Sequence, residues 1–289
     1  MTLSVSGLIE LVRTFRHIDR SAVSPEIKAK LKKTYFWTFF LKRYDPASRT
    51  ADIAGYRFKY CTYKVLAYFF REIFLGQEYL FTADNPAPFI IDCGSNIGMS
   101  VLYFKLLYPE SCVLAFEPDD DAFSCLEANV RGNGLKSVSI NKIALSGSAG
   151  KINFYYNKDE PGSRTMSTLR QRMPGEARTV EAAPLSSYID KEVDFLKMDI
   201  EGAEQAVLEE LRSSGRLCRV KQMAIEYHHH IQAGEDSLSK MLVILEDAGF
   251  GYQVTGALAR PFQSGKFQDI LIYAYRKDAA AAGASGKTA

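Results

Sequence analysis

The sequence lacks the cysteine patterns and the long apolar runs that mark several classes of protein. Its five cysteines are odd in number, lie far apart and include no Cys-x-x-Cys pair, which argues against a disulfide framework or a zinc knuckle and favours a reducing compartment. The aromatic-rich run at residues 35–41 is far shorter than the roughly 20 residues that span a bilayer. Glu10, Arg13 and Arg16 interrupt the first apolar stretch, so no secretory signal is expected. These absences predict a cytoplasmic protein without a transmembrane segment.

An excess of charge of one sign is also absent from the chain as a whole. The 289 residues carry a net charge of +2, so no global attraction to nucleic acid is expected, and no basic, aromatic-rich stripe is present. Residues 1–60 differ, with 12 Lys/Arg against 5 Asp/Glu. This local excess could face an anionic partner or a membrane surface, and solvated helix faces explain it equally well. We predict no nucleic-acid partner.

The first 85 residues predict a helical N-terminal extension. Apolar residues recur at helical spacing over 8–18, and Ser24 begins a second helix as its N-cap. Residues 50–60 alternate as in a small hairpin, and 63–75 predict a third helix. We expect residues 1–85 to act as a lid, to contact the acceptor or to form a homodimer interface. Simple core packing is the alternative explanation for their aromatic side chains.

Residues 86–278 predict a single α/β domain, because short apolar segments alternate there with amphipathic helices. The predicted strands are 89–93, 113–116, 138–143, 194–198, 223–227, 250–254 and 270–275. The predicted helices are 98–107, 119–133, 203–213 and 237–249. The pattern indicates a parallel sheet with right-handed crossovers that ends in an antiparallel hairpin. The polar segment 157–178 predicts a mobile loop, and the small-residue tail at 279–289 predicts disorder.

A glycine-rich turn follows the first of these strands. Residues 92–98 read Asp-Cys-Gly-Ser-Asn-Ile-Gly, and Gly94 and Gly98 allow the backbone to turn sharply and to approach a ligand closely. Asn96 is the residue type, after glycine, that best tolerates a positive φ. The glycine spacing differs from that of a dinucleotide-binding turn. On its own, the turn is equally compatible with a purely structural role.

The second strand strengthens the interpretation as a nucleotide site. It ends in Glu117-Pro118, about 20 residues beyond the turn, which is where an acid bonds the hydroxyls of a ribose. The alternative is an exposed acid that leads into the next helix, but Asp119, Asp120 and Asp121 already supply that capping charge. The two elements together predict a nucleotide-like ligand at the carboxyl ends of the strands.

Four segments together resemble the FkbM family of methyltransferases. They are residues 72–79, 91–98, 115–118 and 194–204, and the likeness extends from about Glu72 to Val254. The resemblance implies a Rossmann-like class I methyltransferase fold with a seven-stranded sheet, S-adenosylmethionine as cofactor, and O-methylation of a sugar, glycan or natural product. It places the cofactor against a set of residues on the first three strand ends: Asp92, Gly94, Ser95, Asn96, Gly98, Glu117, Pro118, Ala144 and Leu145.

The candidate catalytic residues follow the fourth and fifth strands. Methyl transfer to a hydroxyl needs alignment of the reacting atoms and a base. Asp199 follows the fourth strand and Glu201 the turn after it, and His228 lies at the end of the fifth. Helix capping, for the acids, and solvent exposure, for the histidine, are the alternatives. A divalent ion on Asp199, Glu226 and His228 is conceivable, but no spacing motif predicts a metal site.

Two other functions stay open on the sequence alone. A nicotinamide-dependent oxidoreductase would share the sheet, although its third glycine is missing, and a non-catalytic scaffold would keep the fold without activity. The sequence does not identify the acceptor, which we expect to be a small molecule or a glycan. It also leaves open O- or N-methylation, the identity of the base, and the oligomeric state.

Overall fold

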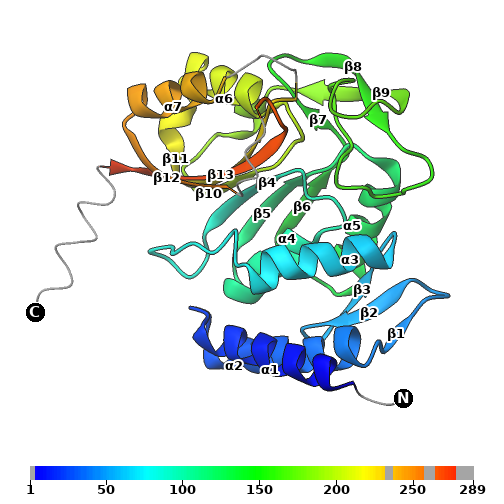
Figure 1. Cartoon of the computed structure of the whole chain (residues 1–289). Helices are drawn as coiled ribbons and strands as arrows, with labels where there is room; N and C mark the ends of the chain where they lie inside the picture. The colour runs from blue at the N-terminus through cyan, green and yellow to red at the C-terminus, as the bar shows by residue number, and fades with distance from the viewer. Residues whose placement is uncertain (1–3, 232–236, 257–263, 278–289) are drawn as a thin grey trace, which may run out of the picture.

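The computed structural model describes residues 4–231, 237–256 and 264–277; the predicted disordered tail at 279–289 lies outside these ranges. Figure 1 shows a central sheet between two layers of helices, with the first two helices of the chain forming a further layer at the bottom of the view. Among the described residues, no helix combines the length and apolar character needed to cross a membrane.

Seven strands form the central sheet, in the spatial order β12-β13-β11-β10-β4-β5-β6. Five strands, β11, β10, β4, β5 and β6, run parallel to one another. The strand β13 is antiparallel to both of its neighbours, β11 and β12. The bounds are β4 Phe89–Cys93, β5 Cys112–Phe116, β6 Val138–Asn141, β10 Val193–Met198, β11 Val220–His229, β12 Phe250–Gly256 and β13 Gln268–Arg276. The predicted Rossmann-like sheet, mostly parallel and ending in an antiparallel hairpin, is confirmed.

Helices cover both faces of this sheet, which explains why its central strands are buried and mostly apolar. Every residue of β10 is buried, as expected for a strand packed on two sides. One face shares a core with α4 Met99–Leu107 and α5 Asp120–Gly132. The other shares a core with α6 Glu204–Ser213 and α7 Leu238–Asp247. The short 3-10 helices η3 Leu185–Tyr188 and η4 Leu217–Arg219 belong to the second face.

The N-terminal extension contains the predicted helices and hairpin. Its elements are α1 Val5–Arg20, α2 Pro25–Thr34, η1 Tyr35–Phe40, β1 Tyr44–Asp45, β2 Thr50–Ile53, β3 Tyr56–Lys59, α3 Tyr63–Phe69 and η2 Phe70–Leu75. Both η segments are π-helical continuations of the helices before them. The extension shares one core with α4 and α5, so it packs against the sheet domain.

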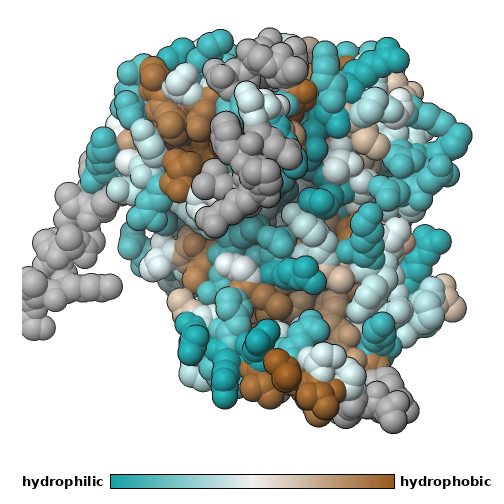
Figure 2. Space-filling model, in the orientation of Figure 1, coloured by the Kyte–Doolittle hydropathy of each residue, from teal (hydrophilic) through white to brown (hydrophobic). Residues whose placement is uncertain are grey.

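The outer side of the extension keeps an apolar surface. Several large apolar side chains of α1 and η1 remain exposed: Val5, Leu8, Ile9, Val12 and Trp37. Figure 2 shows hydrophobic side chains at the bottom of the molecule, where these helices lie. The predicted homodimer interface stays a prediction.

Besides the central sheet and the small β1-β2-β3 sheet of the extension, a further three-stranded sheet is present that was not predicted from the sequence. It consists of β7 Ala144–Leu145, β9 Glu176–Ala183 and β8 Gly150–Tyr156, in that order. Most residues of β8 and β9 are exposed or half-buried. Apolar side chains do alternate along β8, at Ile152, Phe154 and Tyr156, but β9 consists mainly of polar and small residues and has no such pattern. The end of the segment predicted as a loop, residues 176–178, therefore belongs to β9.

Candidate active site

The carboxyl ends of β4, β5 and β10 surround a cavity of about 590 Å3 that opens to solvent, here called the main cavity. Its walls come from these strand ends, from β7, and from the segment between β8 and β9. The lining residues are Phe69, Gly94, Asn96, Phe116, Glu117, Pro118, Ile143, Ala144, Leu145, Phe154, Ser163, Arg164, Met166, Thr168, Asp199, Ile200 and Glu201. The main cavity thus occupies the place at which ligands bind in open α/β sheets.

The glycine turn brings the ends of β4 and β10 into close contact. Gly94 has φ +80, and a Cβ at this position would overlap the carbonyl oxygen of Asp199. Asn96 also has a positive φ, of 46, as the sequence suggested. Gly98, with φ +85, begins α4, and a Cβ there would lie 2.8 Å from Cδ1 of Leu126. Gly94 is therefore required by backbone contact, and Gly98 by packing against a side chain.

Three of the predicted cofactor residues lie behind the cavity wall. Asp92 is fully buried, and its Oδ2 accepts a hydrogen bond from Ser100 Oγ at 2.5 Å. Ser95 Oγ donates to the carbonyl oxygen of Asp92. Gly98 does not line the cavity either. These residues shape the turn, whereas the other six predicted residues line the main cavity.

A buried lysine, Lys197 on β10, supports the turn from below and was not singled out in the sequence. Its Nζ donates to the carbonyl oxygens of Cys93 and Gly94. The same nitrogen lies 3.5 Å from Asp92 Oδ1 and 3.6 Å from Asp199 Oδ2. A lysine between the apolar residues Leu196 and Met198 of a predicted strand was the available signal, because buried lysines require anionic partners.

Glu117 occupies the position predicted for a ribose-binding acid. Its Oε2 accepts the backbone N–H of Asn96 at 2.9 Å, and its Oε1 accepts that of Asp119 at 2.8 Å. Burial, assisted by the nearby Asp119 charge, raises the pKa of Glu117 to about 8 against the effect of these two donors. The carboxyl group is fixed in orientation, and each oxygen has a lone pair left for a ligand.

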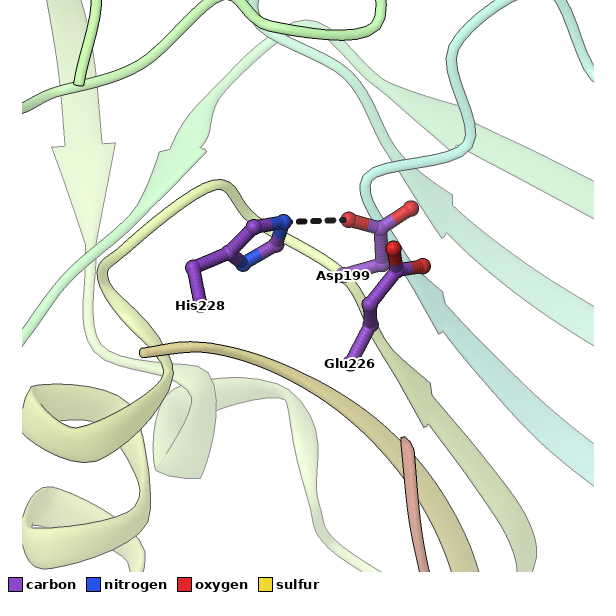
Figure 3. Close-up of side chains that lie close together, drawn as sticks. All are labelled: Asp199, Glu226 and His228. Atoms are coloured by element: carbon purple, nitrogen blue, oxygen red, sulfur yellow. Dashed lines mark ion pairs between the residues drawn. The ribbon is translucent and has the colours of Figure 1, made fainter. Parts of the chain in front are cut away.

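On the β10–β11 side, His228 is surrounded by carboxylates (Figure 3). Its Nδ1 lies 2.9 Å from Glu204 Oε1, and its Nε2 lies 3.2 Å from Glu201 Oε2 and 3.9 Å from Asp199 Oδ1. Burial opposes a charge on the ring, but the charges of Glu204 and Glu201 outweigh it and raise the pKa of His228 well above its usual value. The histidine therefore carries a proton in the absence of another cation.

Glu201 joins this cluster to the segment between β8 and β9. Arg172 places Nε and a terminal guanidinium nitrogen 2.7 Å from Glu201 Oε2, and Ser167 Oγ donates to the carbonyl oxygen of Glu201. Burial raises the pKa of Glu201 to about 7, although the charge of His228 opposes the rise. Residues of the predicted mobile loop thus contact the site; its mobility stays a prediction. Its contribution to the site was missed because the segment has no periodic pattern.

A second hollow, here called the acidic pocket, lies next to the cluster. Its empty volume is about 680 Å3. The lining residues are Tyr68, Glu72, Glu78, Glu226, Thr255, Gly256, Asp269 and Leu271. Burial and the proximity of Glu72 raise the pKa of Glu78 to about 8. One donor atom from each of Asp199, Glu226 and His228 lies within 4.8 Å of the others, so the main cavity and the acidic pocket meet at these side chains.

The structure therefore brings the three predicted catalytic residues together. Asp199 and Glu201 line the main cavity, and His228 lies behind them with a side chain that is 1% exposed. Their roles stay predictions. Asp269, from β13, was missed because nothing in the sequence pairs β13 with β11.

Comparisons with known proteins identify the family of this chain. The sequence matches the family described as the methyltransferase FkbM domain over residues 92–252, which is more than half of the chain. Methyltransferase sdnD from Sordaria araneosa is 31% identical over 182 residues, 52% of this chain and 70% of that protein. The 31-O-demethyl-FK506 methyltransferase FkbM from Streptomyces tacrolimicus is 24% identical over 216 residues, 63% of this chain and 81% of that protein.

A solved structure can be compared as well. The methyltransferase FkbM from Methylobacillus flagellatus KT has 15% sequence identity and a TM-score of 0.48, over 93% of this chain and 60% of that one. The present chain thus spans less than two thirds of that protein. The family match over residues 92–252 confirms the resemblance seen in the sequence motifs: the chain belongs to the FkbM methyltransferase family.

Proposed function

We propose that this protein is an S-adenosylmethionine-dependent O-methyltransferase whose acceptor is a hydroxyl group on a sugar, a glycan or a natural product. The observation that carries the proposal is that the main cavity and the acidic pocket meet at one group of ionisable side chains. The main cavity has six of the nine predicted cofactor residues in its wall, and the acidic pocket adjoins it at Asp199 and Glu226. A two-substrate reaction needs this arrangement, with the reacting atoms at the junction.

The lining of the main cavity is chemically suited to the proposed cofactor. Glu117 offers two fixed carboxyl oxygens to a ribose diol, and apolar Ile143 and Leu145 offer a surface for an adenine. Gly94 keeps the turn free of a side chain on the opposite wall. When bound, S-adenosylmethionine supplies an electrophilic methyl group on its sulfonium.

The acidic pocket fits an acceptor with several hydroxyl groups. Carboxyl groups form hydrogen bonds with hydroxyls in either protonation state, and three of them, Glu72, Glu78 and Glu226, line the pocket beside the aromatic ring of Tyr68. The same pocket would disfavour an anionic acceptor such as a nucleic-acid backbone. The printed name of the Streptomyces tacrolimicus relative, an O-methyltransferase of FK506, supports this acceptor class.

Asp199 is the proposed base, and Glu201 is a second candidate. Asp199 lines the main cavity, and its Oδ1 is buried without a hydrogen-bond partner among the described residues. His228, the alternative base, must first give up the proton that Glu204 and Glu201 stabilise. We therefore assign His228 the role of orienting the carboxylates, which contact it at both ring nitrogens.

The test is to incubate the purified protein with S-adenosylmethionine and a panel of hydroxylated acceptors, and to search the products by mass spectrometry for the addition of one CH2. Fragmentation then locates the methyl group on oxygen or nitrogen. Calorimetry with S-adenosylmethionine and with NAD, in parallel, distinguishes the oxidoreductase alternative. Saturable binding of NAD without binding of S-adenosylmethionine would contradict the proposal. Binding of S-adenosylmethionine with no methylated product from any acceptor would favour a scaffold.

A further inference from the structure

We infer that the protein binds a divalent metal ion through Asp199, Glu226 and His228, at the junction of the main cavity and the acidic pocket. Figure 3 shows the His228 ring turned toward the Asp199 carboxylate, with the Glu226 carboxylate beside it. The use of the ion in methyl transfer rests on the proposed function, but its binding does not.

The three side chains converge because of their places in the sheet. Glu226 and His228 are two residues apart on β11, so they project from the same face of the strand. Asp199 follows β10, the parallel neighbour of β11. One donor atom from each lies within 4.8 Å of the others. Ligands at about 2.1–2.2 Å from one ion lie at most about 4.4 Å apart, so closure by a few tenths of an ångström would complete a site.

The histidine is oriented as metal-binding histidines are. Its Nδ1 faces the buried Glu204 carboxylate at 2.9 Å. Its Nε2 points toward Asp199 Oδ1 at 3.9 Å and also lies 3.2 Å from Glu201 Oε2. A histidine that binds a metal through one ring nitrogen almost always donates the other N–H to a carboxylate or a carbonyl. Glu204 would thus hold both the tautomer and the direction of His228.

Among the residues that the structure describes, several carboxylate oxygens at this point have no hydrogen-bond donor. Asp199 Oδ2 faces Lys197, but Asp199 Oδ1 is buried with no hydrogen-bond partner among the described residues. The same holds for Asp269 Oδ1, which lies 3.9 Å from His228 Nε2. Within the described part of the chain, Glu226 forms neither a hydrogen bond nor an ion pair. Buried acceptors without donors are rare and need an explanation.

A proton on His228 explains only part of this arrangement. The imidazolium would pair with Glu204 and Glu201, while Glu226 and Asp199 Oδ1 would keep no donor. A cation among Asp199, Glu226 and His228 would bind Asp199 Oδ1 and Glu226, and Nε2 of His228 would exchange its contact with Glu201 for the ion. One imidazole nitrogen with carboxylate oxygens suits a divalent first-row ion such as Mn2+.

The ion would lie where the acceptor hydroxyl is proposed to react. A hydroxyl bound to a divalent ion loses its proton more readily. With Asp199 engaged by the ion, Glu201 would accept that proton, because its carboxylate lies in the wall of the main cavity. The proton moves from the acceptor oxygen to the carboxylate, and no oxidant or reductant is needed.

The test uses Mn2+ alone, without methyl donor or acceptor. The full-length protein is treated with EDTA, desalted and titrated with Mn2+, and the free ion is followed by electron paramagnetic resonance. We expect one Mn2+ per chain. We expect Asp199→Asn and Glu226→Gln each to weaken binding at least about tenfold, since each removes a charged ligand. Glu72→Gln, which removes a charge from the same pocket but no proposed ligand, should change the Mn2+ affinity by less than about twofold.

Folding of each variant is checked by circular dichroism, and Glu226→Gln decides the test if Asp199→Asn does not fold. Failure of the wild-type protein to bind Mn2+ would overturn the inference, as would wild-type affinity in both ligand variants. Equal losses in Glu72→Gln and Glu226→Gln would also overturn it, because they would show general electrostatic attraction. Mn2+ binding without methyl transfer would contradict the proposed function but would still support the metal site.

Discussion

The two sides of the candidate site differ in how their carboxylates are satisfied. On the β4–β5 side, each oxygen of Glu117 accepts a backbone N–H, so the group is held in one orientation. On the β10–β11 side, Asp199 Oδ1 and Asp269 Oδ1 are buried without partners in the described part of the chain. Carboxylates whose hydrogen bonds are all formed hold a site in one geometry for its ligand. Carboxylates without hydrogen-bond partners can form their contacts with a ligand when it binds. The comparison indicates a rigid cofactor side and a reactive side completed by what binds there.

The largest effect is expected on the reactive side, from Asp199→Asn. The amide keeps the shape of the carboxylate but neither accepts a proton nor carries its charge, so kcat for methyl transfer should fall about 100-fold or more. The affinity for S-adenosylmethionine should change by less than about threefold. Steady-state kinetics and calorimetry measure the two quantities. A large loss of cofactor affinity with unchanged kcat would place Asp199 on the cofactor side. The distinction between a cofactor side and a reactive side would then be wrong for this residue.

The rigidity of the cofactor side can be tested in the glycine turn. Gly94→Ala should lower the free energy of unfolding by about 3 kcal/mol or more, because the added methyl meets the Asp199 carbonyl oxygen and the residue has φ +80. Gly98→Ala is the matched control. It shares the positive φ, but its nearest neighbour is the movable Leu126 side chain. We expect a loss of about 1–2 kcal/mol there. Urea denaturation of both variants measures this, and equal losses would show that backbone contact at Gly94 is unimportant.

The difference between the two sides also explains what the sequence could predict. The cofactor side is marked in the sequence by local patterns: a glycine turn after one strand and an acid after the next. Six of the nine residues predicted there line the main cavity. The central sheet was equally predictable, because strands covered on both faces, such as β10, are buried along their length and mostly apolar.

The reactive side depends on contacts between distant segments, so only part of it was predictable. Asp199, Glu201 and His228 follow strand ends and were singled out, but Asp269 reaches the cluster through the pairing of β13 with β11. Arg172 comes from a segment without any periodic pattern, and Lys197 looks in the sequence like a single polar residue in a strand. Strand order and the path of long loops are set by tertiary packing, which local patterns do not record.

A third prediction separates binding from chemistry at Glu117. Glu117→Ala removes the proposed partner of two ribose hydroxyls, and each hydrogen bond contributes about 0.5–1.5 kcal/mol, more when the carboxyl group is ionised. The affinity for S-adenosylmethionine should fall about 10- to 100-fold, with kcat at saturation within about threefold. Calorimetry and kinetics measure both. Glu127→Ala, an exposed acid on α5, should leave the affinity unchanged. If Glu117→Ala instead reduced kcat at saturation while cofactor affinity held, Glu117 would belong to the reactive side.

The smallest expected effect is a pH dependence of cofactor affinity. Because burial raises the pKa of Glu117 to about 8, most molecules carry a neutral carboxyl group there at neutral pH. Ribose hydroxyls donate best to the ionised form, so affinity should rise with pH through about 8, by about tenfold between pH 7 and pH 9. The raised pKa also means that the free energy of unfolding of the cofactor-free protein falls as pH rises from the ordinary glutamate value to about 8, since the folded state holds the proton longer.

Glu117→Gln removes the titrating group and supplies the control for this last effect. Its affinity for S-adenosylmethionine should be nearly independent of pH over the same interval, and the slope of unfolding free energy against pH should become shallower. Calorimetric titrations at a series of pH values compare the two proteins directly. A slope that persists in Glu117→Gln would mean that the titrating group lies among the carboxylates around His228, and the cofactor side would then share the electrostatics of the reactive side.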